Sequence, residues 1–138
     1  MTFRALMPDE HELHAVRAAL LPFTALRLAL VFGSVARHEA GPQSDVDVAV
    51  LARHRLTAQE HIALIEAVAR HTGRPVDLVD LANTGHPLQG EILRDGVRVL
   101  GDAAAHAQWT TRALFDAADF YPYVKRLLAE RRQRWIGP

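Results

Sequence analysis

The chain has 138 residues, enough to bury one ordinary core, and 49% of them are hydrophobic. Its 16 basic and 16 acidic residues balance, so no overall charge points to nucleic acid or to an anionic membrane. Cysteine is absent, which excludes disulfides, thiolate metal sites and cysteine nucleophiles. The first residues lack the apolar core of a secretory signal, and no run approaches the ~20 apolar residues of a membrane span. We therefore expect a cytoplasmic protein.

Helical and strand-like patterns alternate along the chain. The run LRLALVF is bounded by Pro22 and Gly33 and is typical of a buried strand, while Thr57 and Glu60 have the spacing of a capping box. In chain order we expect a helix at 8–21, a strand at 26–32, a short helix at 34–39, a strand at 45–51, a helix between 57 and 73, a strand at 74–81, a helix at 88–94, a strand at 97–100, and a helical segment at 103–135 interrupted near Pro122. This order predicts the α/β class, with a small mixed β-sheet and helices packed against it in a single domain, 1–138.

Two aspartates lie at the start of the second predicted strand. Successive side chains of a strand point to opposite faces, so Asp45 and Asp47 share one face about 7 Å apart. At that range two carboxylates repel by roughly 3 kcal/mol in an effective dielectric near 20. A purely structural strand gains nothing from this repulsion, whereas Mg²⁺ favours carboxylate oxygens and often shares them with substrate phosphates. The pair therefore indicates a metal site, although a solvated strand end with two incidental aspartates remains the alternative.

A Gly-Ser pair follows the first predicted strand. Gly33 lacks a Cβ, which lets a phosphate approach the backbone, and the Ser34 hydroxyl adds a donor beside a helix start. Ten residues separate Ser34 from Asp45, enough for a short helix and a return into a neighbouring strand. The anion cradle and the carboxylates would then lie at one edge of the sheet. A triphosphate bridged by Mg²⁺ could occupy the gap between them.

Phosphoryl chemistry with two metal ions also needs a carboxylate near the attacking hydroxyl. Asp77 and Asp80 on the third predicted strand are the candidates, and their odd spacing places them on opposite faces. Asp77 lies deeper within the apolar run, where an unpaired charge is hardest to explain structurally. Asp80 lies near the strand end, where it could be solvated or cap the next turn. We favour Asp77.

The segment GSVARHEAGPQSDVDV resembles the Gly-Ser, ten residues, Asp-x-Asp signature of the polymerase-β-like nucleotidyltransferase superfamily. Together with RPVDLVDL and ILRDGVRVL, it is similar to the minimal nucleotidyltransferases (MNT) of that superfamily. The similarity covers a core of about 10–101, followed by C-terminal helices at about 103–135. It implies the polymerase-β-like fold, Mg²⁺ as two ions, and ATP as the substrate.

The resemblance also assigns roles to residues. Gly33 and Ser34 would hold the triphosphate, Arg37 would contact phosphate, and we count Ser44, the only other serine, with the nucleotide-binding candidates. His38 stands where the minimal members commonly have a small residue, often Gly. The implied catalytic and metal-binding residues are Asp45, Asp47 and Asp77.

Many minimal nucleotidyltransferases are antitoxins of HEPN-domain ribonuclease toxins. The resemblance therefore implies transfer of AMP from ATP to a tyrosine hydroxyl of a HEPN toxin, within a hetero-oligomer with that toxin. Neither membrane binding nor direct nucleic-acid binding is expected. Two alternatives stay open, namely a non-catalytic antitoxin that inhibits by binding alone and a nucleotidyltransferase acting on a small molecule such as an aminoglycoside.

The C-terminal stretch YVKRLLAERRQRWIGP combines basic residues with an apolar stripe. Its arginines and Trp135 could dock a partner helix or RNA. Alternatively, it is an amphipathic helix that packs on the sheet and turns a basic face to solvent.

Overall fold

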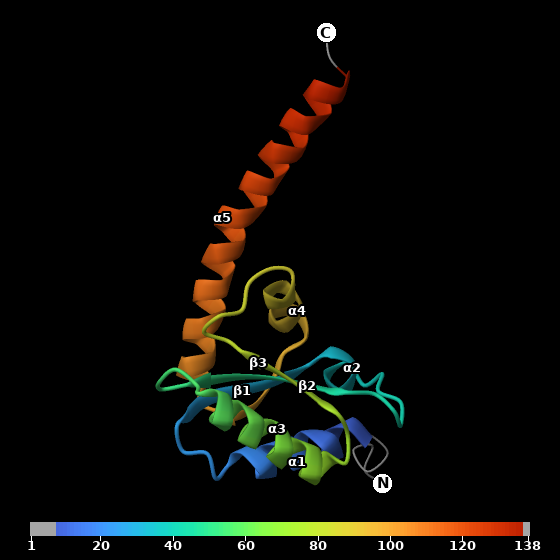
Figure 1. Cartoon of the computed structure of the whole chain (residues 1–138), viewed down its shortest axis with the longest axis vertical. Helices are drawn as coiled ribbons and strands as arrows, with labels where there is room; N and C mark the ends of the chain where they lie inside the picture. The colour runs from blue at the N-terminus through green and yellow to red at the C-terminus, as the bar shows by residue number, and fades with distance from the viewer. Residues whose placement is uncertain (1–7, 137–138) are drawn as a thin grey trace.

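The computed structural model describes residues 8–136, apart from the side chains of 8, 9, 120, 121, 123, 124 and 133–136. Five helices and four strands alternate in this part of the chain (Figure 1). In order they are α1 (Pro8–Leu20), β1 (Leu26–Phe32), α2 (Gly33–Ala36), β2 (Val46–Ala52), α3 (Ala58–Thr72), β3 (Val76–Asp80), α4 (Leu88–Asp95), β4 (Val97–Gly101) and α5 (Ala103–Ile136). The predicted α/β class is confirmed.

The four strands form one mixed sheet in the order β3-β2-β1-β4. Strand β1 pairs antiparallel with both β2 and β4, while β2 pairs parallel with β3. The end of β1 and the starts of β2 and β3 therefore meet at one end of the sheet. We call this end, where the strands begin or finish, the sheet edge; it is distinct from the outer strands β3 and β4. The two residues that close this edge are Phe32, opposite Asp47, and Asp77, beside Asp47 on the next strand.

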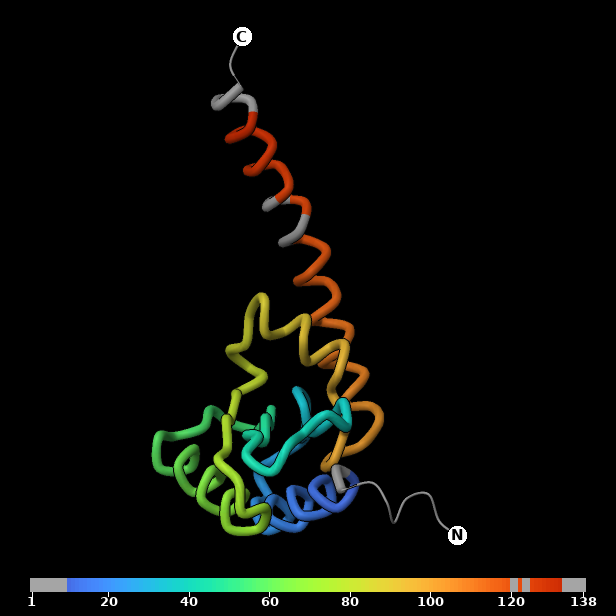
Figure 2. The backbone as a smooth tube through the Cα atoms, turned by 90° about the vertical axis from the view of Figure 1, so that its right-hand side faces the viewer, coloured from blue at the N-terminus to red at the C-terminus, as the bar shows by residue number. Residues whose placement is uncertain are grey.

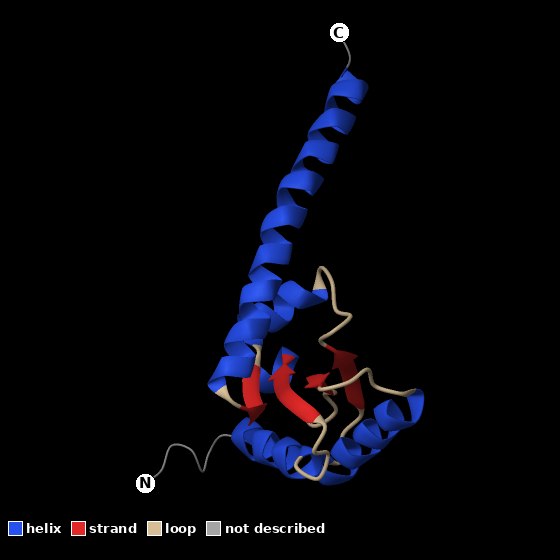
Figure 3. Ribbon diagram, turned by 90° about the vertical axis from the view of Figure 1, so that its left-hand side faces the viewer, coloured by secondary structure: helices blue, strands red, loops and turns tan. Residues whose placement is uncertain are grey.

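Helices cover both faces of the sheet (Figure 3). One face, which includes Val31, Val46 and Val48, packs against α1 and α3 through residues such as Leu20 and Leu64. The opposite face packs against α4 and α5 through Phe32, Ala49, Ile92 and Trp109 among others. Because side chains alternate along a strand, Asp47 and Asp77 lie on the α4/α5 face, in line with Ala49 and Val79.

The predicted capping box at the start of α3 and the predicted glycine at its end are confirmed. The Thr57 hydroxyl accepts a hydrogen bond from the Glu60 backbone, and the Glu60 carboxylate accepts one from the Thr57 backbone, so the capping box is complete. Gly73 ends α3 with a φ of 68°, a left-handed conformation that glycine adopts without a Cβ penalty. The helix predicted at 34–39 is shorter, ending at Ala36.

The predicted interruption near Pro122 is wrong, because α5 runs unbroken from Ala103 to Ile136 as one helix. Its first turns pack on the domain, with Ala105, Trp109 and Ala113 buried on one side. Its later part extends away from the domain (Figures 1 and 2). The alternative that YVKRLLAERRQRWIGP packs on the sheet is wrong for its described side chains, 125–132, which are exposed. No helix in the described part of the chain is long and apolar enough to cross a membrane.

Trp109 anchors α5 to the sheet, since only 5% of its surface is exposed. Truncating a buried aromatic residue to alanine removes apolar contacts and leaves a cavity, so Trp109→Ala should lower the free energy of unfolding by about 3 kcal/mol. Leu114→Ala, five residues later on an exposed side of α5, should change it by less than about 0.5 kcal/mol. Urea denaturation of the two variants measures the difference. Equal losses would contradict the packing described for α5.

Candidate active site

The three predicted carboxylates lie at one edge of the sheet. Asp47 occupies the second position of β2 and pairs in register with Asp77 of β3, and Asp45 lies one residue before β2. Asp45 and Asp77 are exposed, whereas Asp47 is half-buried. Directly paired residues on adjacent strands have side chains about 5 Å apart, so Asp47 and Asp77 are neighbours. The fold therefore brings together the carboxylates that sequence spacing predicted to meet.

Gly33 connects this carboxylate cluster to the end of β1. Its φ is 72°, in the region that glycine adopts readily, and it is fully buried against Asp47. A Cβ at this position would collide with Oδ2 of Asp47 and lie 3.0 Å from its Cγ. Gly33 is thus required both by its backbone conformation and by the close approach of the Asp47 carboxylate.

Negative charge accumulates around Asp47. Burial, together with the charges of Asp77, Glu91 and Asp45, raises the pKa of Asp47 to about 6, and the Arg37 guanidinium opposes this only in part. Placing Asp47 among like charges does not stabilise the domain by itself. A bound divalent cation would neutralise these carboxylates. The donor set therefore fits Mg²⁺, which prefers carboxylate oxygens.

The described residues contain no preformed group of three or more carboxylate or imidazole side chains that could hold a metal ion on their own. This agrees with the usual behaviour of Mg²⁺, which is bound by one or two carboxylates and completes its shell with waters and substrate phosphates. A metal here would thus arrive with the nucleotide rather than occupy a closed protein cage.

Arg37, predicted to contact phosphate, is held by acidic side chains in this structure. Its Nη1 lies 3.0 Å from Oδ2 of Asp95 and 4.0 Å from Oε1 of Glu91, and its Nε lies 3.1 Å from Oε2 of Glu39. Glu39 and Asp95 raise the pKa of Arg37 above its usual value. The guanidinium therefore links the α2 loop to α4 and stays beside the carboxylate cluster.

Sequence reasoning missed Glu91 and Asp95. They lie four residues apart on α4, so they face the same side of that helix, and Glu91 contributes to the raised pKa of Asp47. Their i, i+4 spacing was visible in the sequence, but which face of α4 meets the sheet edge depends on tertiary packing. They extend the acidic site beyond the three predicted aspartates.

The loop that delivers Asp45 is fixed by hydrogen bonds. Arg74 donates from Nη1 to the carbonyl oxygens of Gly41 at 2.6 Å and Ser44 at 3.0 Å, and its Nε lies 3.3 Å from Oε1 of Glu12. The Ser44 hydroxyl, a predicted nucleotide ligand, accepts a hydrogen bond from the Gly41 backbone at 2.8 Å. Ser44 thus has a structural role in this loop, and Arg74 is a supporting residue that the sequence did not reveal.

His38 has a φ of 60°, the left-handed conformation that β-carbons disfavour. This explains why a small residue suits the position in the resembling family. Ser34, by contrast, lies half-buried in α2, where its carbonyl accepts a hydrogen bond from the Glu39 backbone at 2.9 Å.

The structure distinguishes the two candidates for the third carboxylate. Asp80 accepts hydrogen bonds from the Ala82 backbone at 2.9 Å and from Asn83 Nδ2 at 3.4 Å, so it caps the turn after β3. It pairs with Val50, on the face opposite Asp47. Asp77 alone of the two lies beside Asp47, but the expectation that it is deep in an apolar run is wrong, because it is exposed on the edge strand β3.

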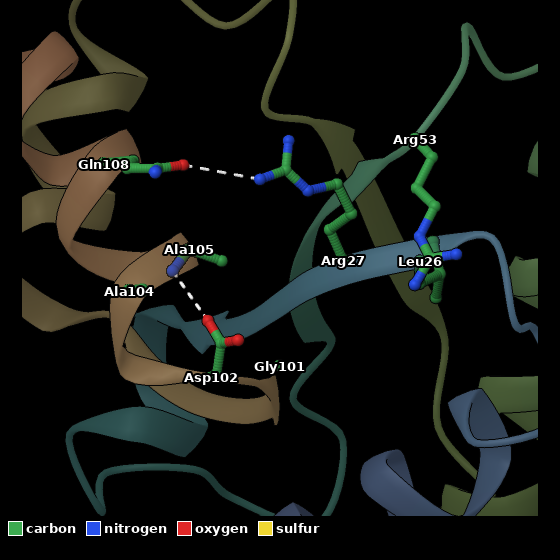
Figure 4. Close-up of a pocket in the computed structure, with 8 residues that line it drawn as sticks. All are labelled: Leu26, Arg27, Arg53, Gly101, Asp102, Ala104, Ala105 and Gln108. Carbon is green, nitrogen blue, oxygen red and sulfur yellow. Dashed lines mark hydrogen bonds between the residues drawn. The ribbon is translucent and has the colours of Figure 1, made fainter.

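None of the described cavities is lined by a predicted site residue. A cavity of about 340 Å³ lies at the opposite end of the sheet, where β1 begins and β4 ends. Arg27 and Arg53 line it, and Arg27 donates to Gln108 of α5 at 3.4 Å (Figure 4). The carboxylate cluster is therefore separate from this cavity, at the other end of the sheet.

Gly33→Ala should destabilise the protein more than Gly73→Ala, although both replace a glycine with a positive φ. At Gly73 an added Cβ would have no atom within 4 Å. Gly73→Ala should therefore lower the free energy of unfolding only by the cost of a positive φ in alanine, about 1 kcal/mol. Gly33→Ala should lose about 2 kcal/mol more, because the Asp47 carboxylate must also move. Urea denaturation without divalent cations measures both. Similar losses would show that Asp47 does not approach Gly33.

Asp47→Asn should stabilise the metal-free protein at high pH. Because the folded-state pKa of Asp47 is about 6, above its usual 3.8, ionisation costs stability progressively as pH rises from about 4 to 7. With solvent screening of the half-buried side chain, the gain at pH 8 should be about 1 kcal/mol and should shrink toward pH 4. The measurement is urea denaturation at both pH values in the presence of EDTA, with Glu66→Gln, an exposed carboxylate on α3, as the control. An equal effect of Asp47→Asn at both pH values would contradict this.

Comparisons with known proteins agree with this geometry. The chain superposes with a TM-score of 0.76 on a protein in a crystal structure of a toxin-antitoxin with AMP-PNP, at 21% identity over 87% of this chain and 98% of that one. It superposes at 0.72 on a protein from a tri-AMPylated Shewanella oneidensis HEPN toxin in complex with MNT antitoxin, at 19% identity over 90% of this chain and 98% of that one.

A shorter match is closer in sequence. The structure of a protein described as a minimal nucleotidyltransferase is 34% identical over 62% of this chain and 90% of that one, with a TM-score of 0.53. No curated protein matches the sequence. Residues 17–104 match the family model of the polymerase β nucleotidyltransferase domain, which is most of the described core and contains all seven predicted site residues. The chain therefore belongs to the polymerase β nucleotidyltransferase family.

Proposed function

We propose that this protein is an antitoxin that transfers AMP from ATP to a tyrosine hydroxyl of a HEPN ribonuclease toxin, in a reaction that depends on Mg²⁺. The observation that carries the chemistry is the half-buried Asp47, surrounded by like charges and pressed against Gly33 at the sheet edge. A carboxylate in that setting suits a cation and a phosphate chain, and the chain belongs to a nucleotidyltransferase family.

Each site residue has a proposed role. Asp45, Asp47 and Asp77 hold Mg²⁺, which would neutralise charge on the triphosphate and on the pyrophosphate as it leaves. Gly33 and Ser34 hold the triphosphate at the end of β1. Because Asp77 is exposed on the edge strand, an acceptor hydroxyl can reach it.

The reaction balances as a simple displacement. The tyrosine oxygen attacks the α-phosphorus of ATP, a new P–O bond forms, and the bond to the β-phosphate oxygen breaks to release pyrophosphate. The tyrosine proton passes to a nearby carboxylate, for which we propose Asp77, and from there to water. Holding the two reactants in line at the sheet edge supplies much of the rate.

The acidic partners of Arg37 support a role in nucleotide binding. In this structure Asp95, Glu91 and Glu39 hold the guanidinium next to the carboxylate cluster. A triphosphate bound at Gly33 would compete with these exposed ion pairs, each of which contributes little by itself. Arg37 can then exchange a carboxylate for a phosphate oxygen without leaving the site.

The HEPN toxin as partner is supported by two structural neighbours. One is a protein from a toxin-antitoxin structure with AMP-PNP, and the other is from a complex of a tri-AMPylated HEPN toxin with an MNT antitoxin. Because both neighbours come from structures of toxin-antitoxin complexes, a macromolecular acceptor is better supported than an aminoglycoside. Inhibition by binding alone remains the runner-up and is an outcome of the test below.

The test incubates the purified protein with Mg²⁺, ATP labelled at the α-phosphate, and the HEPN protein encoded beside it. We expect label on the toxin with the wild-type chain, and a loss of at least about 100-fold with Asp45→Asn/Asp47→Asn, because the metal ligands are removed. Asp77→Asn should lose a similar factor, whereas Asp80→Asn should label normally, because Asp80 only caps a turn.

Glu66→Gln, on the opposite helical layer, is the matched carboxylate control and should label like the wild type. Full toxin inhibition by a stable complex, without any label, would replace AMP transfer with inhibition by binding. Label on an aminoglycoside and not on the toxin would favour the small-molecule transferase.

A further inference from the structure

In the second half of α5, every side chain that the structure describes is exposed. Asp116, which accepts a hydrogen bond from the buried Gln89 of α4 at 3.5 Å, is the last described residue of α5 that bonds to another element. From Ala118 to Arg132 every described side chain is exposed. We call residues 114–132 the arm. At 1.5 Å per residue, the arm is about 28 Å long, and it stands clear of the domain in two perpendicular views (Figures 1 and 2).

Large apolar side chains are exposed on the arm. Phe115 is 68% exposed and Leu128 is 59% exposed, and Leu114 and Leu127 are also exposed. Helices in proteins derive most of their stability from packing apolar side chains against another element, and nothing in the described part of the chain covers these four. The arm therefore has the composition of a helix that packs against another molecule.

Pro122 strengthens this argument. It lies inside the arm, where a proline removes a backbone hydrogen bond and disfavours the helix. In isolation this cost is not offset, because the described side chains of the arm beyond Ala117 are exposed. Packing against a partner would supply the missing stabilisation.

The charges of the arm indicate the kind of partner. The outer part of the arm, 125–132, carries four basic residues, Lys125, Arg126, Arg131 and Arg132, and one acid, Glu130, while Asp116 and Asp119 lie nearer the domain. At 100° per residue, Leu114, Lys125, Leu128 and Arg132 fall within about 60° of one another around the helix, so apolar and basic side chains share one side. RNA would complement the basic side chains of the arm but not its exposed leucines. An acidic protein surface with an apolar stripe matches both.

A second copy of this chain is a poorer match. Its arm would again present the basic cluster, and the two carboxylates near its base, Asp116 and Asp119, are fewer than the four cations they would have to meet. One of them already accepts a hydrogen bond from Gln89.

The position of the arm connects it to the site. Helix α5 packs on the same face of the sheet as α4, and Asp47 and Asp77 lie on that face. A protein bound along the arm would therefore stand over the layer that carries the carboxylate cluster. That is where an acceptor hydroxyl must arrive.

We propose that the arm is the docking helix for the AMP-accepting toxin, which it binds through an acidic surface with an apolar stripe. This inference rests on the proposed function for the identity of the partner. The arm then provides affinity and orientation, while the sheet edge provides the chemistry.

Two variants on the side shared by apolar and basic residues test this, Lys125→Glu/Arg132→Glu and Leu114→Ser/Leu128→Ser. Each should weaken binding of the toxin at least tenfold, measured by calorimetry, because an interface loses charge or apolar complementarity. The matched control, Arg53→Glu/Arg55→Glu, makes the same charge change at exposed positions outside the arm and should bind like the wild type. All variants should retain the circular dichroism of the folded domain and bind a non-hydrolysable ATP analogue with Mg²⁺ as the wild type does.

The outcomes separate this inference from the proposed function. Unchanged toxin binding by both arm variants would overturn the arm proposal, even where the toxin is labelled. Weaker binding by the arm variants with no labelling by the wild type would support the arm and overturn AMP transfer. A change confined to self-association of the chain, seen by light scattering, or binding of the arm only to RNA or to anionic vesicles, would overturn the arm proposal in favour of those occupants. No binding of the toxin by the wild type would overturn both.

Discussion

The site depends on one constraint, the register in which β1, β2 and β3 meet at a single edge of the sheet. Asp47 faces Phe32 on one side and Asp77 on the other. A slip of one residue in β2 would move Asp47 to the α1/α3 face and bring a valine to the edge in its place. The buried alternation of Val46, Val48 and Val50 prevents that slip, because those side chains form the α1/α3 core. Packing of the valines on one face of β2 thus fixes the position of Asp47 on the other.

The same register accounts for two unfavourable local features nearby, the positive φ of Gly33 and the raised pKa of Asp47. Gly33 must be glycine because the Asp47 carboxylate occupies the space of its Cβ. Asp47 has a raised pKa because the sheet holds it beside Asp77 while α4 brings Glu91 close. Arg37 and Arg74 brace the loop between β1 and β2 from opposite ends, through α4 and through the α3–β3 connection. Strain and like charge are concentrated where a bound nucleotide would relieve them.

The sequence predicted what local chemistry determines. The capping box at Thr57 and the Asp-x-Asp pair involve residues within a few positions of one another, so their geometry follows from the helix or strand alone. Asp77 lies beside Asp47, but the prediction that it is deep in an apolar run is wrong, because only the strand order makes β3 an edge strand. The Arg37 link to Asp95 joins residues 58 positions apart, which no local pattern reveals. Pro122 is the reverse case. Its local preference predicts a helix break, but α5 continues through it.

Two features of this domain cost stability when the protein is alone. The acidic sheet edge keeps Asp47 among like charges, and the arm presents Phe115 and Leu128 to water. Neither contributes to the two cores, which are complete without them. Folding does not require these features, so their physical reason lies in what they bind. A metal-bound triphosphate would neutralise the first and an acidic protein surface would cover the second. Because both lie on the α4/α5 side of the sheet, one bound partner can be held by the arm while its hydroxyl reaches the edge where the phosphates are held.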